Sequence, residues 1–328
     1  ILETMRALST QPPLPNDVVV LITDAEEEGL FGARAFVSAH AWAKDVSVVL
    51  NFEARGSTGP AAMFEVTRQN GFLVDALAHA GVRRPVATSL TGEVYRRMPN
   101  DTDLTVFARA GMAGMNFAFA DGVARYHTAR DRPEELDPRS VQHQLDYALP
   151  LVRALGAADL ATPRAPDRVY FAVGSWLVRY PARFALGLAI AVSGAFALLL
   201  GADVRRGLVR VQDVALAAVA VLTFVLLGGA VGILVEQLAQ LVARDPVRAR
   251  GIDSLAPDVE RLGLALAVVA VVGLALAELA RRLPPPAVVR GALAPVALLA
   301  LLVAFTAPGA SHVLVWPVAA ATAALALE

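Results

Sequence analysis

The sequence predicts two bodies of different class: an α/β domain with a mostly parallel mixed sheet over residues 1–160, and an all-α region with several membrane-spanning helices over residues 184–328. Two observations carry this division. Residues 1–170 hold most of the acidic residues, four of the five histidines and most of the turn signals. Residues 184–328 are a series of apolar runs separated by short charged gaps. Residues 161–183 lie between the two bodies and are predicted to be an interfacial linker.

The composition limits the partners and the chemistry. Apolar residues make up 56% of the chain and the mean hydropathy is +0.54, too high for a soluble protein of 328 residues. A formal net charge of −1 argues against nucleic acid as a partner. The chain has no cysteine, which excludes disulfides and thiolate ligands, so any bound metal must be held by carboxylates and imidazoles.

The predicted α/β domain is organised around residues 18–29. Residues 18–23, rich in β-branched types, predict a buried central strand, and four acids follow among the next five residues. Carboxylates packed at the end of a buried strand repel one another, so they persist where a cation or a proton-transfer task offsets the cost. Two interpretations stay open for this segment alone: a metal site, or a solvated acidic turn that caps the next helix.

The following segments extend this domain. Helical spacing over residues 30–41 and an apolar run over 46–52 complete a predicted βαβ unit with parallel strands. Glu53, at the end of that run, and the pair Glu26 and Glu27 are therefore expected at one edge of the sheet. Further strands are predicted over 61–66 and 112–120, and helices over 71–80, 103–110 and 138–155. His127 lies in a loop, where a single histidine is more often a surface residue than a ligand.

Four motifs follow one another in this domain, at residues 23–33, 50–53, 100–103 and 126–128. Together they resemble the zinc-dependent exopeptidase family of bacterial leucyl aminopeptidases and glutamate carboxypeptidase II. Residues 51–56 and the multi-span tail look like its membrane-anchored branch, the vacuolar membrane protease and endoplasmic reticulum metallopeptidase group. The resemblance implies a three-layer peptidase domain, a peptide substrate, two zinc ions in the intact protein, and a peptidase domain on the non-cytosolic side of a membrane.

The resemblance also implies a role for each matching residue. Glu26 resembles the general base and Glu27 a zinc ligand, since one carboxylate must bind the cation while its neighbour takes a proton from the attacking water. Glu53 stands where the family usually has a ligand aspartate, and His127 resembles the last zinc ligand. Tyr126 resembles a neighbour that helps to stabilise an oxyanion. Three further residues are expected to bind substrate: Arg55, Asp101 and Asp103.

Two ligands of the family are absent from this sequence: a histidine in a His-x-Asp motif and an aspartate that bridges both metals. Because Ile1 lies in an amphipathic helical pattern and Glu328 in an apolar run, we expect a partial domain at each end. Glu27, Glu53 and His127 alone give neither ion the three protein ligands of a catalytic zinc. The sequence therefore predicts a zinc exopeptidase. An aminopeptidase is expected only because aminopeptidases are the commoner kind in the family, and no residue points to it. The 328-residue chain by itself is expected to bind zinc poorly and to cleave nothing. The alternative is a non-catalytic membrane protein that uses the domain for binding or scaffolding.

The membrane region is predicted from five apolar runs, at residues 184–200, 214–235, 262–280, 291–307 and 313–327. No run carries a charge in its middle, which disfavours an ion pathway. The flanking arginines are divided equally between the two sides, so charge alone does not set the orientation. Trp176 and two tyrosines in residues 167–181 suit a membrane interface. Nothing in the sequence indicates an oligomeric state.

Overall fold

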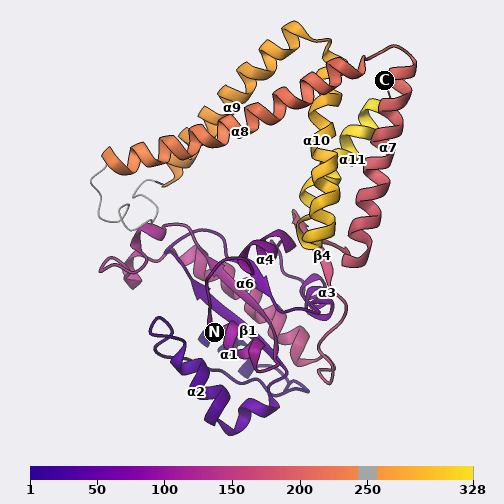
Figure 1. The fold of residues 1–328 in the computed structure, drawn as a ribbon. Helices are drawn as coiled ribbons and strands as arrows, with labels where there is room; N and C mark the ends of the chain where they lie inside the picture. The colour runs from indigo at the N-terminus through magenta and orange to yellow at the C-terminus, as the bar shows by residue number, and fades with distance from the viewer. Residues whose placement is uncertain (243–256, 328) are drawn as a thin grey trace. The chain divides into compact units, whose positions relative to one another are not determined.

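A three-stranded mixed sheet organises the first of two units in the computed structural model, which describes residues 1–242 and 257–327 (Figure 1). The units are residues 1–184 and 185–328. The strands are β1 (Val48–Ala54), β2 (Ala62–Val66) and β3 (Ala113–Phe119), in the order β1-β3-β2. The central strand, β3, is parallel to β1 and antiparallel to β2.

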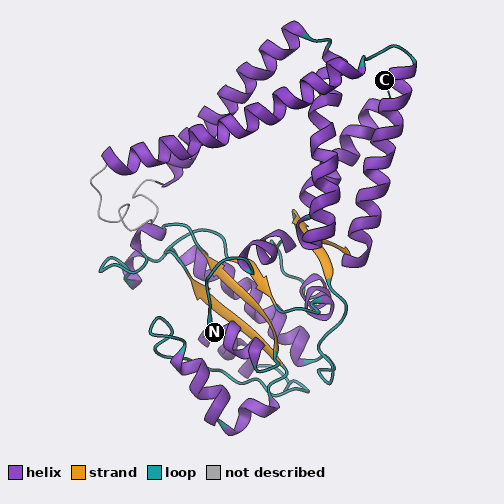
Figure 2. Cartoon of the chain, viewed as in Figure 1, coloured by secondary structure: helices purple, strands orange, loops and turns teal. Residues whose placement is uncertain are grey.

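Helices surround the sheet, and a hairpin ends the unit (Figure 2). The α-helices are α1 (Leu2–Ser9), α2 (Phe31–Ala39), α3 (Gly71–His79), α4 (Ser89–Tyr95), α5 (Asp103–Arg109) and α6 (Pro138–Gly156). The short 3₁₀ helices are η1 (Ala41–Asp45), η2 (Val123–Arg125), η3 (Pro133–Glu135) and η4 (Ala182–Phe184). The hairpin strands are β4 (Arg168–Val173) and β5 (Trp176–Pro181).

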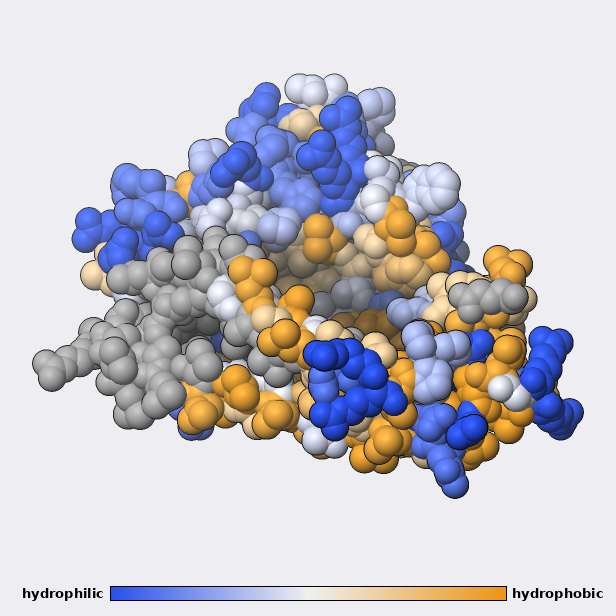
Figure 3. Space-filling model, turned by 90° about the horizontal axis from the view of Figure 1, so that it is seen from above, coloured by the Kyte–Doolittle hydropathy of each residue, from blue (hydrophilic) through white to orange (hydrophobic). Residues whose placement is uncertain are grey.

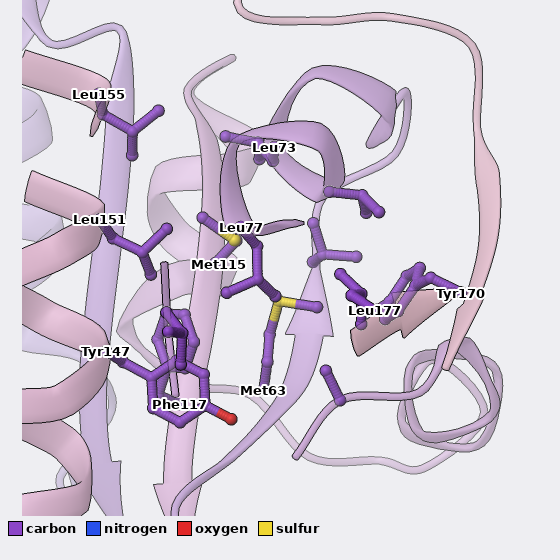
Figure 4. Packing of buried hydrophobic residues seen from close by; sticks show 14 of the residues in the cluster. Met63, Leu73, Leu77, Met115, Phe117, Tyr147, Leu151, Leu155, Tyr170 and Leu177 are labelled. Atoms are coloured by element: carbon purple, nitrogen blue, oxygen red, sulfur yellow. The ribbon is translucent and has the colours of Figure 1, made fainter. Parts of the chain in front are cut away.

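The alternation of side chains along the strands gives the sheet two different faces. On one face Met115 and Phe117 of β3 pack against Tyr147 of α6 and against α3, in a cluster whose members are almost fully buried (Figure 4). On the other face Val49 of β1 packs with Phe107 of α5 and with α2. Each buried side chain of this size contributes about 1.5–3 kcal/mol to folding. Helices therefore cover both faces of the sheet, and the mixed α/β class predicted from the sequence is confirmed.

The predicted central strand at residues 18–23 is wrong. The segment is extended, forms no strand, and leaves Val19 41% and Ile22 78% exposed. A strand needs a hydrogen-bonded neighbour, and in the described residues β1 pairs with β3 alone, so β-branched composition did not produce pairing here. The predicted βαβ unit fails with it, because the parallel partner of β1 is β3. Residues 89–95, between the predicted helices over 71–80 and 103–110, form α4, for which the sequence predicts no element.

The second unit is helical. Its helices are α7 (Ala185–Arg205), α8 (Val211–Val242), α9 (Pro257–Arg282), α10 (Pro285–Thr306) and α11 (His312–Ala326), with η6 (Pro308–Ala310) before the last. Three helical segments are long and apolar enough to cross a membrane: Ala182–Arg205, Val211–Leu234 and Pro285–Thr306. Figure 3 shows broad apolar surface beside compact hydrophilic clusters. The region is therefore a membrane region with at least three candidate spans, and the other two predicted spans stay predictions.

One buried ion pair joins two of these helices. Arg290 Nε of α10 lies 2.6 Å from Asp203 Oδ2 of α7, with both side chains at most 5% exposed. Arg290 is one of the arginines that flank the predicted apolar runs, and its side chain is buried against Asp203. Three other flanking arginines, Arg244, Arg248 and Arg250, lie outside the described residues.

Candidate active site

The acidic loop, residues 24–30, connects the extended segment to α2. Its backbone closes on itself, since Leu30 N donates to Glu26 O at 2.8 Å and Gly32 N donates to Asp24 O at 3.0 Å. Ala25 and Leu30 adopt left-handed φ values of 54° and 61°. Residues without a glycine's freedom take this conformation at a cost, and such positions gather at functional sites. Leu30 is the N-cap of α2 and no side chain caps it, so the structure does not support the helix-capping interpretation.

Glu27 in this loop contacts two neighbouring aromatic residues, Tyr126 and His127, about a hundred positions later in the sequence. His127 Nε2 lies 2.6 Å from Glu27 Oε1, and the Tyr126 hydroxyl donates to the same oxygen at 3.2 Å. The rings of Tyr126 and His127 stack at 3.8 Å between centroids. His127 also adopts a left-handed φ of 57°. A strained backbone thus presents the imidazole to a carboxylate about a hundred residues away in sequence.

The loop that carries His127 is held by the turn after β1. Ser57 N and Thr58 N both donate to Asp121 O, and Asp121 N donates back to Thr58 O. Arg125 of η2 donates to Ser57 Oγ at 3.0 Å and pairs with Glu135 at 2.8 Å. Gly56 is needed at this crossing because a Cβ there would lie 2.1 Å from Asp121 O. The end of β1 therefore fixes both Glu53 and the His127 loop.

A row of polar side chains crosses the sheet beside these groups. Asn51 of β1, Asn116 of β3 and Glu65 of β2 are in register. Asn51 Nδ2 donates to Glu53 Oε1 at 2.5 Å and to Asn116 Oδ1 at 3.1 Å. Asn116 Nδ2 donates to Glu65 Oε2 at 3.2 Å and to Thr102 Oγ1 at 2.9 Å. Because Asn116 is fully buried, these bonds fix its amide and, through Asn51, one oxygen of Glu53.

The same network reaches the acidic loop through α5. Thr102 caps α5 in a capping box with Thr105, which sets the place of the first helical residue, Asp103. Asp103 Oδ2 accepts a hydrogen bond of 2.6 Å from the hydroxyl of Thr23, directly before the acidic loop. Asp103 is 5% exposed, and its Oδ1 is buried without a hydrogen-bond partner. An orphaned carboxylate oxygen at this place marks the end of the network as a site built to meet a further group.

Burial and crowding of acids shift the pKa values at the site. Burial raises the pKa of Glu53 to about 7. The charges of Glu26 and Asp103 also raise this pKa, and the hydrogen bond from Asn51 lowers it. Burial, and then the charges of Glu27 and Asp103, raise the pKa of Glu26, while His127 lowers it. Burial and the nearby Glu27 charge raise the pKa of Tyr126 to about 12, so the phenol keeps its proton as a donor. Burial also raises the pKa of Glu65.

The remaining predicted residues lie at the margin. Arg55 is near enough to Tyr126 for its charge to lower the pKa of that phenol, and its backbone N–H donates to Phe119 O. Asp101 is half-exposed and faces Arg109 at 3.4 Å. The structure thus brings Glu26, Glu27, Tyr126 and His127 together, places Glu53 and Asp103 in the adjoining network, and leaves Asp101 outside both.

The donor chemistry suits zinc in part. A carboxylate and an imidazole 2.6 Å apart are two ligands of the kind zinc takes. Among the residues that the structure describes, however, no group of three histidine, aspartate or glutamate side chains lies close enough to hold one ion. Glu53 therefore does not form one ligand group with Glu27 and His127, and the metal-binding roles of these three residues stay predictions. The residues present fit half of a zinc site.

Sequence reasoning missed the residues that connect the site. Asn116 and Glu65 stand within predicted strands and have no predicted role, and Thr23 and Thr102 enter only as parts of motifs. A signal was present, because Asn116 interrupts an otherwise apolar strand and Glu65 interrupts another. A polar side chain inside a buried strand must find a partner. Which partner it finds is a matter of cross-strand register, which only the fold provides.

The first unit is thus a mixed α/β domain that gathers carboxylates, an imidazole and a phenol where two loops meet the end of a sheet strand. Comparison with known proteins adds a family resemblance for this domain. Residues 1–152 match the profile of Peptidase family M28.

The relatives are named as a metallopeptidase of the endoplasmic reticulum or as membrane proteases of the vacuole. The chain is 30% identical over 215 residues to endoplasmic reticulum metallopeptidase 1 of Rattus norvegicus, covering 63% of this chain and 24% of the relative. It is 34% identical over 144 residues to the vacuolar membrane protease of Candida albicans, covering 43% and 16%. The corresponding protein of Schizosaccharomyces pombe is 32% identical over 195 residues, covering 57% and 22%. The chain thus spans at most about a quarter of these relatives. No solved structure matches it significantly.

Proposed function

We propose that this chain is part of a membrane-anchored zinc metalloexopeptidase. The observation that carries the proposal is the convergence of Tyr126 and His127 on one carboxylate oxygen of Glu27, about a hundred residues away in sequence. The match of residues 1–152 to the M28 family profile supports the reaction class, and three candidate spans support the anchor. In the whole protein two zinc ions are expected, with Glu27, His127 and Glu53 among their ligands.

The roles proposed for the other residues follow from their surroundings. Glu26, half-buried between acids, is the general base, because its raised pKa makes it a better proton acceptor than an ordinary carboxylate. Tyr126 keeps its proton and is placed to donate a hydrogen bond to an oxyanion. A zinc ion bound at such a site supplies Lewis acidity and lowers the pKa of water.

Aminopeptidase specificity is the finer part of the proposal. Neighbouring acids raise pKa values at the site, which shows that acidic side chains outnumber basic ones here. The acids concerned, as the shifted group or as its charged neighbour, are Glu26, Glu53, Glu65, Asp101 and Asp103. An acidic site attracts the ammonium group of a free peptide N-terminus more than a C-terminal carboxylate. Arg55, Asp101 and Asp103 are proposed to contact substrate. Peptides with a free N-terminus should be cleaved, and the same peptides acetylated at the N-terminus should resist.

A Glu26→Gln substitution in the whole protein tests the catalytic role. Turnover should fall about 10²–10⁴-fold, the usual contribution of a general base, while bound zinc stays unchanged. Glu28→Gln is the matched control, because Glu28 is an exposed acid of the same loop. Undiminished turnover in Glu26→Gln would remove Glu26 from this role.

Zinc binding by the 328-residue chain tests the metal part separately. Because no three donors form one group in the described residues, we expect weak binding by calorimetry, weakened further by His127→Ala, and no hydrolysis by this chain alone. Two tightly held ions in the 328-residue chain would contradict this. If the whole protein binds no zinc, the alternative stands: a non-catalytic membrane protein with a binding or scaffolding domain.

A further inference from the structure

The tip of the β4–β5 hairpin is the most exposed apolar feature near the end of the first unit. Val173 and Trp176 are partners in the hairpin register, on either side of the two-residue turn. They are 56% and 78% exposed. Gly174 in the turn has a φ of 59°, and a Cβ at this position would meet no atom within 4 Å. An exposed tryptophan paired with an exposed valine is costly in water.

The root of the same hairpin is fixed to the domain. Val169 and Tyr170 are fully buried and Leu177 is 9% exposed, with Tyr170 and Leu177 in the apolar cluster over the sheet (Figure 4). Ser89 Oγ donates to Tyr170 O and accepts from Tyr170 N, both at 3.1 Å. A hairpin anchored in this way holds its tip at a set place and does not fold it back to bury Trp176.

Charge is concentrated at the root and is absent from the tip. Asp75 of α3 binds Arg168 of β4 at 2.6 Å and Arg179 of β5 at 2.5 Å. The two turn residues, Gly174 and Ser175, are uncharged, and no charged residue lies between Arg168 and Arg179. An apolar aromatic end on a charged base is the pattern of side chains that sit at the boundary between lipid and water.

The hairpin directly precedes a candidate membrane span, and this favours lipid as the partner of its exposed tip. Ala182 N donates to Asp167 O at 2.8 Å and closes the base of the hairpin, and the candidate span Ala182–Arg205 begins at the same residue. Five residue steps separate Trp176 from Pro181, about 17 Å of extended strand at about 3.3 Å per residue. The tip is therefore tethered within a short distance of the point at which the chain enters the bilayer.

We propose that Val173 and Trp176 insert into the headgroup region of the bilayer that α7 enters, and that the rigid hairpin fixes the first unit against the membrane surface. The partner is the lipid surface itself. The proposal is independent of the peptidase activity and of zinc.

The three tryptophans of the chain provide the test, since they occupy three different surroundings. Trp42 in η1 is 58% exposed in the first unit, Trp176 is at the hairpin tip, and Trp316 lies in the apolar helix α11. Three variants each keep one tryptophan, with phenylalanine at the other two positions. The full chain is reconstituted in vesicles of phosphatidylcholine, with and without brominated acyl chains, and fluorescence is measured with iodide as the aqueous quencher.

We expect brominated lipid to quench Trp176 and Trp316 and to leave Trp42 unchanged, and iodide to quench Trp42 at least twofold more than Trp176. Iodide quenching of Trp176 equal to that of Trp42, with no effect of brominated lipid, would overturn the proposal. That result is also the one expected if another protein, and not lipid, covers the tip. Absent quenching of Trp176 by brominated lipid would overturn the proposal whether or not Trp316 in α11 is quenched.

A second measurement leaves the tryptophans in place. The chain has no cysteine, so Ser175→Cys in the turn carries a unique nitroxide label. Ser38→Cys is the matched control, because Ser38 is also exposed and lies on α2, which Figure 1 places well away from β4. The label at 175 should collide more often with oxygen than with a water-soluble nickel complex, and the label at 38 should show the reverse. Equal behaviour of the two labels would contradict the insertion.

Discussion

At the residue scale, the buried carboxyl of Glu53 makes the stability of the folded chain depend on pH. Burial raises the pKa of this carboxyl from about 4.5 to about 7 in the folded chain. The folded state therefore binds the proton more tightly than the unfolded state does. Without metal, the stability that this proton provides is fully present below about pH 4.5 and is lost as the pH rises to about 7.

A Glu53→Gln substitution should remove that dependence. With a chelator present, the variant should unfold at higher temperature than wild type at pH 8, where wild type must keep a buried charge, and at nearly the same temperature at pH 4. Thermal unfolding followed by circular dichroism measures both. Glu28→Gln, at an exposed position, should match wild type at each pH. A Glu53→Gln effect of equal size at pH 4 and pH 8 would show that ionisation is not the cause.

The sequence predicted which residues belong to the candidate site better than it predicted which of them are in contact. Glu26, Glu27, Tyr126 and His127 could be named because adjacent acids and a loop imidazole in motif order are local features. Their contacts are not local, since the hydrogen bond from Tyr126 to Glu27 spans 99 positions. Strain was also invisible, because a left-handed φ at Ala25 or His127 comes from packing and not from the preference of alanine or histidine.

At the scale of elements, the pairing of β1 with β3 depends on one small residue. A Cβ at Gly114 would lie 2.8 Å from Val49 O and 2.5 Å from Leu104 Cδ1. Leu104 can rotate, but the carbonyl of Val49 is backbone of the neighbouring strand. Close approach of β1 and β3 is what sets Asn51 against Asn116, so Gly114 also supports the polar row.

Gly114→Ala should therefore lower the free energy of unfolding by about 1–3 kcal/mol, the cost of overpacking a close contact. Gly92→Ala in α4 is the control, because its nearest neighbour would be 3.5 Å away and a helix favours alanine over glycine by about 1 kcal/mol. Urea unfolding of both variants gives the comparison. Equal stability of Gly114→Ala and wild type would mean that the strands separate without loss.

In the helical unit, the ion pair of Asp203 and Arg290 joins α7 to α10. Asp203→Asn leaves a buried guanidinium without its charge partner and should cost about 3–5 kcal/mol. The double variant Asp203→Asn with Arg290→Met removes both charges and should recover most of that loss. Unfolding of the purified chain in detergent micelles measures the series. A double variant as unstable as the single one would show that the pair is not held by its charges.

At the scale of the whole molecule, each unit has its own apolar clusters. Those of the first unit lie on the two faces of the sheet, and those of the second lie between its helices. Stability effects at distant sites without shared partners add. Combining Gly114→Ala with Asp203→Asn should therefore give the sum of the two single effects within about 0.5 kcal/mol. A coupling energy clearly above that value would show that the units fold as one.

The sequence by itself determined the class of each part and the chemical groups at the site. Apolar periodicity fixed β1, β3 and most helices, and run length fixed the membrane region, because these signals lie within a few turns of chain. Only the tertiary structure decided which strands pair. Residues 18–23 have a strand's composition and yet no partner, while Asn116, unremarked in a strand, connects Glu65, Thr102 and, through Asn51, Glu53. The physical reason is that hydrogen bonds and burial are satisfied between segments far apart in sequence, so composition shows the need for a partner and only the fold selects it.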